Sequence, residues 1–144
     1  MSAYADTSFL VSCYLTDNHT PQARAYLSAS GAPLPFTALH ALEVRNACQL
    51  GIFRGLFTSA QAQAAWANLT TDLRDGRLFH ASVNWPVAFR VAATLSEQHS
   101  SALGTRSLDI LHIVAAQSLR MQDFASFDLR QSSLATAVGL KVFP

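Results

Sequence analysis

Residues 107–116 are Ser107-Leu108-Asp109-Ile110-Leu111-His112-Ile113-Val114-Ala115-Ala116, a run that is apolar on almost every side of a helix. A helix without a polar face is normally buried at the centre of a domain. We therefore expect a central helix over residues 107–120, capped by Ser107, whose first turn carries Asp109 toward the interior. A carboxylate in that place needs a partner, because losing its hydration costs several kcal/mol or forces it to neutralise.

Short apolar segments alternate with longer stretches of helical period on either side of this helix. The alternation predicts an α/β fold with a mostly parallel, roughly five-stranded sheet, formed by residues 1–144 as a single domain. We expect strands near residues 2–5, 33–36, 77–80, 123–126 and 140–143. We expect helices at residues 7–16, 20–29, 37–51, 58–74, 86–100, 107–120 and 129–137.

Glycine and proline support several of these boundaries. Gly31 and Gly139 follow the second and last helices, where a helix commonly stops. Pro33 and Pro35 favour the start or edge of a strand, because proline has no N–H to donate within a sheet. Thr58 and Ser59 are candidate caps for a peripheral helix over residues 58–74.

The composition indicates an ordered protein with one substantial core. Of 144 residues, 50% are hydrophobic and only 13% are charged. The net charge of +1 provides no broad field for nucleic acid, so phosphate binding would have to be local. The first apolar run is broken by Ser12, and we expect no signal peptide, no membrane span and a cytoplasmic location.

The cysteines and histidines form no metal-ligand or nucleophile pattern. Cys13 and Cys48 lie in apolar helical stretches, which predicts two reduced core residues. His112 lies one helical turn after Asp109, so both a metal role and an ordinary core or rim position are open to it. Because a zinc site would require several nitrogen or sulfur ligands, we favour the core or rim position.

Four acidic residues have mainly apolar neighbours: Asp6, Glu43, Asp109 and Asp128. Three of them follow expected strands or begin an expected helix, and α/β folds bind ligands at those junctions. Taken singly, Asp6 and Asp128 are also suited to cap helices, the latter with help from Gln131, and Asp109 suits a helix dipole. Glu43 lies in mid-helix and does not fit that alternative. Because two carboxylates about 4 Å apart repel by about 4 kcal/mol at an effective dielectric near 20, four converging acids predict a divalent cation.

Four motifs carry a resemblance to a known family: Tyr4-Ala5-Asp6-Thr7-Ser8, Leu42-Glu43-Val44, Ser107-Leu108-Asp109-Ile110-Leu111-His112 and Ser126-Phe127-Asp128-Leu129-Arg130. In order, spacing and neighbouring residues, the chain resembles the PIN-domain nucleases, and among them the VapC-type toxins of toxin–antitoxin pairs. The tail over residues 134–140 is similar to the closing helix and strand of this family. The resemblance spans the whole chain.

The resemblance implies a PIN-like three-layer α/β/α sandwich that hydrolyses RNA with Mg²⁺ or Mn²⁺. Asp6 and Asp109 match the principal metal ligands, while Glu43 and Asp128 match acids that bind directly or through water. It also implies a homodimer and a cognate antitoxin that blocks the active site. Independently, Mg²⁺ prefers carboxylate oxygen, and a bound metal supplies hydroxide near neutral pH.

Further polar and apolar residues have two interpretations each. Ser8 and Ser126 match the hydroxyl positions near the family's metal site, and are equally suited to local hydrogen bonds. Arg106 and Arg130 flank two of the acids and are suited either to grip phosphate or to face solvent or a partner. A partner surface and core packing are the alternatives for four large side chains: Phe53, Leu56, Phe57 and Trp66.

The leading hypothesis is a metal-dependent endoribonuclease, the toxin of a type II toxin–antitoxin system. One alternative is a PIN-like module that binds or scaffolds without cleavage. Another is a housekeeping nuclease that processes RNA or cuts DNA.

Overall fold

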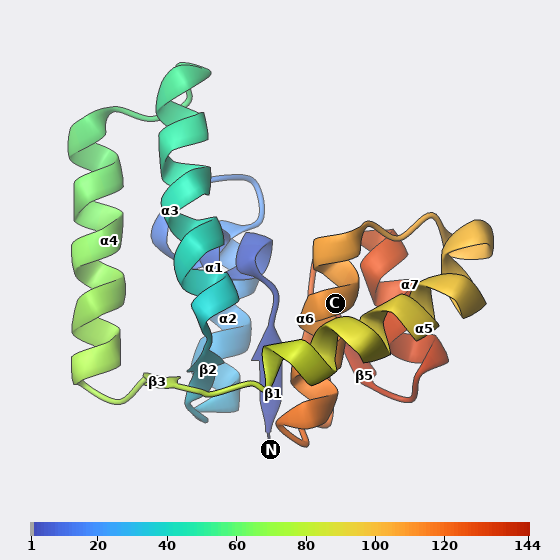
Figure 1. Cartoon of the computed structure of the whole chain (residues 1–144). Helices are drawn as coiled ribbons and strands as arrows, with labels where there is room; N and C mark the ends of the chain where they lie inside the picture. The colour runs from blue at the N-terminus through green and yellow to red at the C-terminus, as the bar shows by residue number, and fades with distance from the viewer. Residues whose placement is uncertain (1) are drawn as a thin grey trace. The chain divides into compact units, whose positions relative to one another are not determined.

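The computed structural model describes residues 2–144 and contains, within them, seven helices and five strands. The helices are α1 (Thr7–Tyr14), α2 (Thr20–Ser30), α3 (Ala38–Phe53), α4 (Ser59–Arg74), α5 (Trp85–Leu103), α6 (Ser107–Ser118) and α7 (Leu129–Ala137). The strands are β1 (Ala3–Ala5), β2 (Leu34–Phe36), β3 (Leu78–His80), β4 (Asp123–Ala125) and β5 (Lys141–Phe143). Figure 1 shows their order along the chain. Each expected helix and strand is confirmed, with boundaries shifted by at most a few residues.

The strands form two parallel sheets, so the prediction of one roughly five-stranded sheet is wrong. A three-stranded sheet has the order β1-β4-β5, and a separate two-stranded sheet joins β2 to β3. Every strand is only three residues long. Among the described strands, β2 is hydrogen-bonded only to β3. The expected edge position of Pro35 is confirmed, because β2 has a single hydrogen-bonded neighbour.

The chain divides into two compact units. The first, here called the sheet unit, contains residues 2–6 and 81–144; the second, the helical unit, contains residues 7–80. The interpretation of residues 1–144 as a single domain stays a prediction.

In the sheet unit, α6 is buried almost all round, as the sequence predicts. Residues 110–116 of this helix are all buried, and α5 and α7 pack against it. The helix begins at Ser107, so its cap is Arg106 and the expected cap Ser107 is wrong by one residue. His112 is 2% exposed and lies 2.7 Å from the hydroxyl oxygen of Tyr4 through its Nδ1, which confirms a core histidine.

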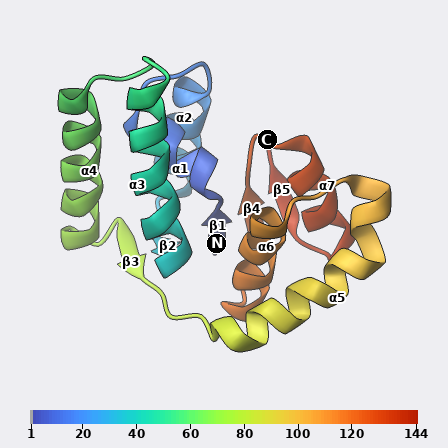
Figure 2. The same ribbon diagram turned by 45° about the horizontal axis from the view of Figure 1, so that its top comes forward.

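In the helical unit, α3 and α4 run side by side, as Figures 1 and 2 both show. Thr58 caps α4 in a reciprocal capping box with Gln61, which confirms one of the two expected caps. Gly31 ends α2 with a φ of 62°, a left-handed conformation that glycine adopts without strain. Arg45 lies over the ring of Trp66, 4.4 Å from its centroid, so these two side chains connect α3 to α4.

Both cysteines are free and buried in the helical unit, as predicted. Burial raises the pKa of the Cys13 thiol from 9.0 to about 12, although the guanidinium of Arg24 acts in the opposite direction. Burial also raises the pKa of Cys48. Alkylating reagents react with the ionised thiolate and not with the neutral thiol, so both cysteines are poorly reactive in the folded protein.

We expect iodoacetamide at pH 8 to label neither Cys13 nor Cys48 in the native protein, and to label both in denaturant. Mass spectrometry of labelled peptides measures this. The Cys13 thiol ionises near pH 9.0 in the unfolded chain and near 12 in the folded protein. The neutral buried thiol therefore contributes fully to folding stability below pH 9, and this contribution is lost as pH rises toward 12. Rapid labelling of the native protein would contradict the expected protection.

Candidate active site

The polar core of the candidate site lies at the carboxyl end of the sheet in the sheet unit. Strands β1 and β4 pair in parallel with Ala5 opposite Ala125, so the residues after them, Asp6 and Ser126, are neighbours. The N–H of Asp6 donates to the carbonyl oxygen of Ala125 at 3.0 Å. The hydroxyl of Ser126 donates to Oδ2 of Asp6 at 2.7 Å. The strand register therefore places this carboxylate and this hydroxyl together.

Asp6 is the most deeply buried of the four candidate acids. It is only 4% exposed, and Ser126 beside it is 1% exposed. The side chains of Asp109 and Asp128 are 18% and 31% exposed. Of the four acids with apolar neighbours in the sequence, Asp6 is thus buried and the other three are only partly buried.

Asp128 is the N-cap of α7, which confirms its expected capping role. Its Oδ1 accepts from the N–H groups of Arg130 at 2.9 Å and Gln131 at 3.0 Å. Its own N–H donates to Oγ of Ser126 at 3.0 Å. Oδ2 of the same carboxylate faces the guanidinium of Arg106. Capping therefore uses one carboxylate oxygen, and the other is paired with Arg106.

Arg106 connects two of the acids. Its Nε donates to Oδ2 of Asp109 at 2.9 Å, and its Nη2 lies 3.6 Å from Oδ2 of Asp128. The guanidinium thus supplies positive charge between two carboxylates that would otherwise repel each other. Since the Arg106 side chain is 74% exposed, it can rotate away without disturbing the core.

The structure brings five candidate residues together in the sheet unit: Asp6, Ser126, Asp128, Asp109 and Arg106. Arg130 touches this group through its backbone, and no ion pair of its guanidinium occurs within residues 2–144.

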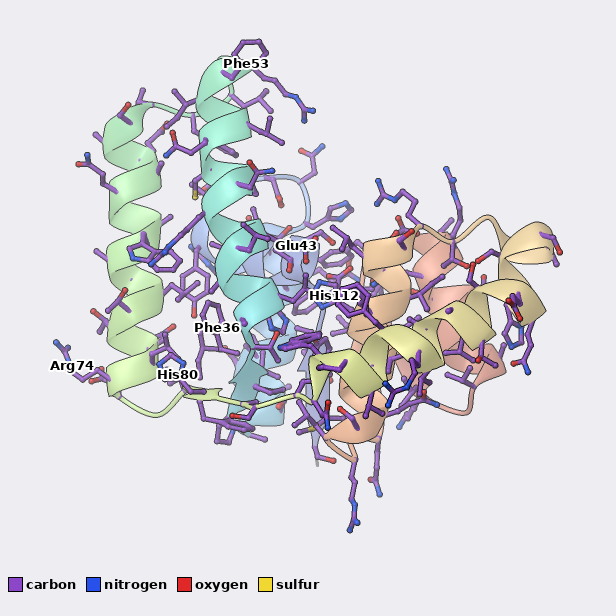
Figure 3. All side chains as sticks on the ribbon, viewed as in Figure 1. Phe36, Glu43, Phe53, Arg74, His80 and His112 are labelled. Carbon is purple, nitrogen blue, oxygen red and sulfur yellow. The ribbon has the colours of Figure 1, made fainter. Side chains whose placement is uncertain are left out.

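Glu43 and Ser8 belong to the helical unit. Glu43 lies near the middle of α3 (Figure 3), is half-buried, and accepts a hydrogen bond of 2.8 Å from Oγ1 of Thr7. Ser8 is exposed in the first turn of α1. Their participation in the site stays a prediction.

Gln131 belongs to this network, although the sequence indicated only a capping partner of Asp128. Its side chain is fully buried and accepts from Oγ of Ser126 at 2.9 Å. The signal available in the sequence was its polarity on the buried face of α7, which it shares with Leu134 and Ala135.

The donor set fits a hard divalent cation. The side-chain donors of Asp6, Asp109, Asp128 and Ser126 are all oxygen, which Mg²⁺ and Mn²⁺ favour over nitrogen or sulfur. Among residues 2–144, no three Asp, Glu, His or Cys side chains lie close enough together to hold an ion as they stand. The guanidinium of Arg106 instead neutralises Asp109 and Asp128. Ion binding would require this guanidinium to move.

No protein-family model matches the chain, and no curated protein matches its sequence. Among solved structures, a chain of VapBC2 from Rickettsia felis, determined with a DNA fragment from its promoter, gives a TM-score of 0.67 at 14% identity, covering 99% of this chain and 98% of that chain. FitAcB from Neisseria gonorrhoeae gives 0.62 at 14% identity, covering 99% and 96%. VapC20 from Mycobacterium tuberculosis, a toxin that cleaves the sarcin-ricin loop, gives 0.66 at 17% identity, covering 99% and 100%. The chain therefore has the fold of VapC toxin structures, as its resemblance to the PIN-domain nucleases implied.

Proposed function

We propose that this protein is a metal-dependent endoribonuclease that acts as the toxin of a type II toxin–antitoxin pair. The observation that carries the proposal is the group of three carboxylates, Asp6, Asp109 and Asp128, joined through Ser126 and Arg106 at the carboxyl end of parallel strands. The fold shared with VapC20 supports RNA as the substrate class, because that toxin cleaves the sarcin-ricin loop.

In this proposal Asp6 and Asp109 hold Mg²⁺ or Mn²⁺ directly, and Asp128 and Glu43 act directly or through water. These residues would hold the ion, and the chemistry it would supply is a water of lowered pKa that gives hydroxide and a positive charge that offsets the phosphate. Ser126 orients the carboxylate of Asp6 through its hydrogen bond of 2.7 Å. The proposed roles extend to Ser8 as a further hydroxyl near the ion.

Arg106 has a second proposed role in substrate binding. When its guanidinium leaves Asp109 and Asp128, its planar fork is available to an RNA phosphate. Arg130, exposed at the start of α7, is the other proposed phosphate ligand. Two exposed arginines supply the local positive charge that a net charge of +1 does not supply globally.

The proposed partners are a second copy of the chain and a small antitoxin that blocks the active site. Four exposed apolar side chains on α3 and the turn after it support a protein partner: Leu42, Leu50, Phe53 and Leu56. Figure 3 shows Phe53 at the end of α3. Among residues 2–144, the structure has no helix that meets the length and apolarity required to span a membrane. The proposed ribonuclease activity implies a cytoplasmic location.

The function is tested by incubating purified, antitoxin-free protein with total RNA from its host and mapping new 5′ ends. We expect discrete ends with Mn²⁺, and none with chelator, because the proposed hydroxide depends on the ion. Asp109→Asn should abolish the same ends. A folded protein that binds Mn²⁺ and cuts DNA would favour the housekeeping nuclease, and one that binds no Mn²⁺ would favour the scaffold.

A further inference from the structure

Gln131 is a fully buried polar residue whose side chain joins two separate helices to the sheet. It lies in the first turn of α7 and is 0% exposed. Its Nε2 donates to the backbone carbonyl oxygen of Asp109 in α6 at 3.1 Å, and its Oε1 accepts from Oγ of Ser126 at 2.9 Å. Both ends of the buried amide are therefore satisfied, which a buried polar group requires.

The two partners determine the orientation of this amide. A carbonyl oxygen can only accept, so the NH₂ of Gln131 must face Asp109 and its oxygen must face Ser126. A flipped amide would place two acceptor oxygens together at 3.1 Å. The Gln131 side chain thus links the first turn of α6 to the end of β4 through hydrogen bonds that allow one amide orientation.

The connection continues from Ser126 to the most buried acid. The hydroxyl of Ser126 has one proton and two acceptors, Oδ2 of Asp6 at 2.7 Å and Oε1 of Gln131 at 2.9 Å. The shorter contact and the negative charge direct the proton to Asp6, and a cation that takes this lone pair of Oδ2 would turn the proton to Gln131 instead. Gln131 is therefore linked to both proposed principal ligands, to Asp109 through its backbone and to Asp6 through Ser126.

We propose that Gln131 is a positioning residue that sets the spacing of Asp6 and Asp109 and thereby raises the affinity of the site for a divalent cation. This inference rests on the proposed function. Residues that orient metal ligands without touching the ion commonly change metal affinity by about 10-fold to 100-fold when they are replaced.

The test uses Gln131→Met, which retains an unbranched side chain of similar length and removes both hydrogen bonds. Titration calorimetry with Mn²⁺, well below the unfolding temperature, is expected to show an affinity about 10-fold to 100-fold below that of the parent. Leu140→Ala is the control, because Leu140 is 8% exposed in the same unit and precedes β5 at the amino end of the sheet, opposite the carboxyl end that carries Asp6 and Ser126. It is expected to lower the melting temperature while leaving Mn²⁺ affinity within about twofold, as interactions remote from the ligands contribute independently.

A double variant separates positioning from general weakening. If Gln131 acts through Ser126, the two substitutions are not additive. The double variant Gln131→Met, Ser126→Ala is then expected to bind Mn²⁺ no more weakly than the weaker of the two single variants. Should Gln131→Met fail to fold, Gln131→Asn replaces it, since its amide is too short to reach both partners. Equal Mn²⁺ affinity in the parent and the folded Gln131 variant overturns the positioning role alone. A parent protein that binds no Mn²⁺ overturns the proposed function, and this inference with it.

Discussion

Replacing Asp6 with asparagine is expected to reduce RNA cleavage by roughly a thousandfold, equivalent to about 4 kcal/mol of lost transition-state stabilisation. Asp6 is 4% exposed and accepts the hydroxyl of Ser126 at 2.7 Å. An asparagine oxygen can still accept that hydrogen bond, so the change removes the charge while keeping the shape. Initial rates of cleavage in Mn²⁺, measured beside the thermal unfolding of both proteins, test the expectation.

Asp75→Asn is the matched control for this substitution. Asp75 follows α4 in the helical unit, its side chain is 45% exposed, and its ion-pair partner among residues 2–144 is the neighbouring Arg74. We expect its removal to leave the cleavage rate within about twofold, because exposed ion pairs of this kind contribute little. If Asp6→Asn cut RNA as fast as the parent, Asp6 would not be a metal ligand.

Phe124→Ala is expected to destabilise the sheet unit by about 3–5 kcal/mol. Phe124 is 0% exposed in β4, the central strand of the three-stranded sheet. Its ring stacks on that of Tyr4 with centroids 5.7 Å apart and an interplanar angle of 7°. Truncation removes this contact and leaves a cavity that the surrounding strands cannot fill. A loss of this size is a large part of the stability of an ordinary domain, about 5–15 kcal/mol.

Urea unfolding followed by tryptophan fluorescence measures the loss, because Trp85 lies in the sheet unit and Trp66 in the helical unit. Phe53→Ala is the control: the same substitution at a side chain that is 87% exposed should change stability by no more than about 0.5 kcal/mol. Equal unfolding midpoints for the two variants would show that Phe124 is not part of a tightly packed core.

Elements of secondary structure were predictable from the sequence because their signals are local. The apolar run of residues 110–116 requires burial wherever the helix lies, and the structure buries it completely. The cap at Asp128 was equally predictable, since an N-cap side chain accepts from the N–H groups two or three residues later in the same turn. The division into two sheets was not, because strands of three residues contain little information about which distant strand they pair with.

The candidate site shows the same limit at the level of single residues. The sequence named Asp6, Asp109, Asp128, Ser126 and Arg106, and the structure brings them together. Arg106 was assigned to solvent, a partner or phosphate, but its guanidinium pairs with two carboxylates. The pairing of Arg106 with Asp128 was not predictable from the sequence, because the two residues are far apart along the chain and approach each other only when α7 packs against α6.

Gln131 illustrates what only tertiary structure decides. Three residues after an N-cap, it suits a capping box, and the local rule places its side chain near the N–H of Asp128. In the structure that N–H donates to Ser126 instead, and the amide of Gln131 turns inward to Asp109 and Ser126. The sequence by itself determined the elements, the buried helix and the candidate acids, because periodicity and capping act over a few residues. Sheet pairing, the position of Arg106 and the role of Gln131 were decided by tertiary structure, because buried polar groups take partners from any segment that packing brings within hydrogen-bond distance.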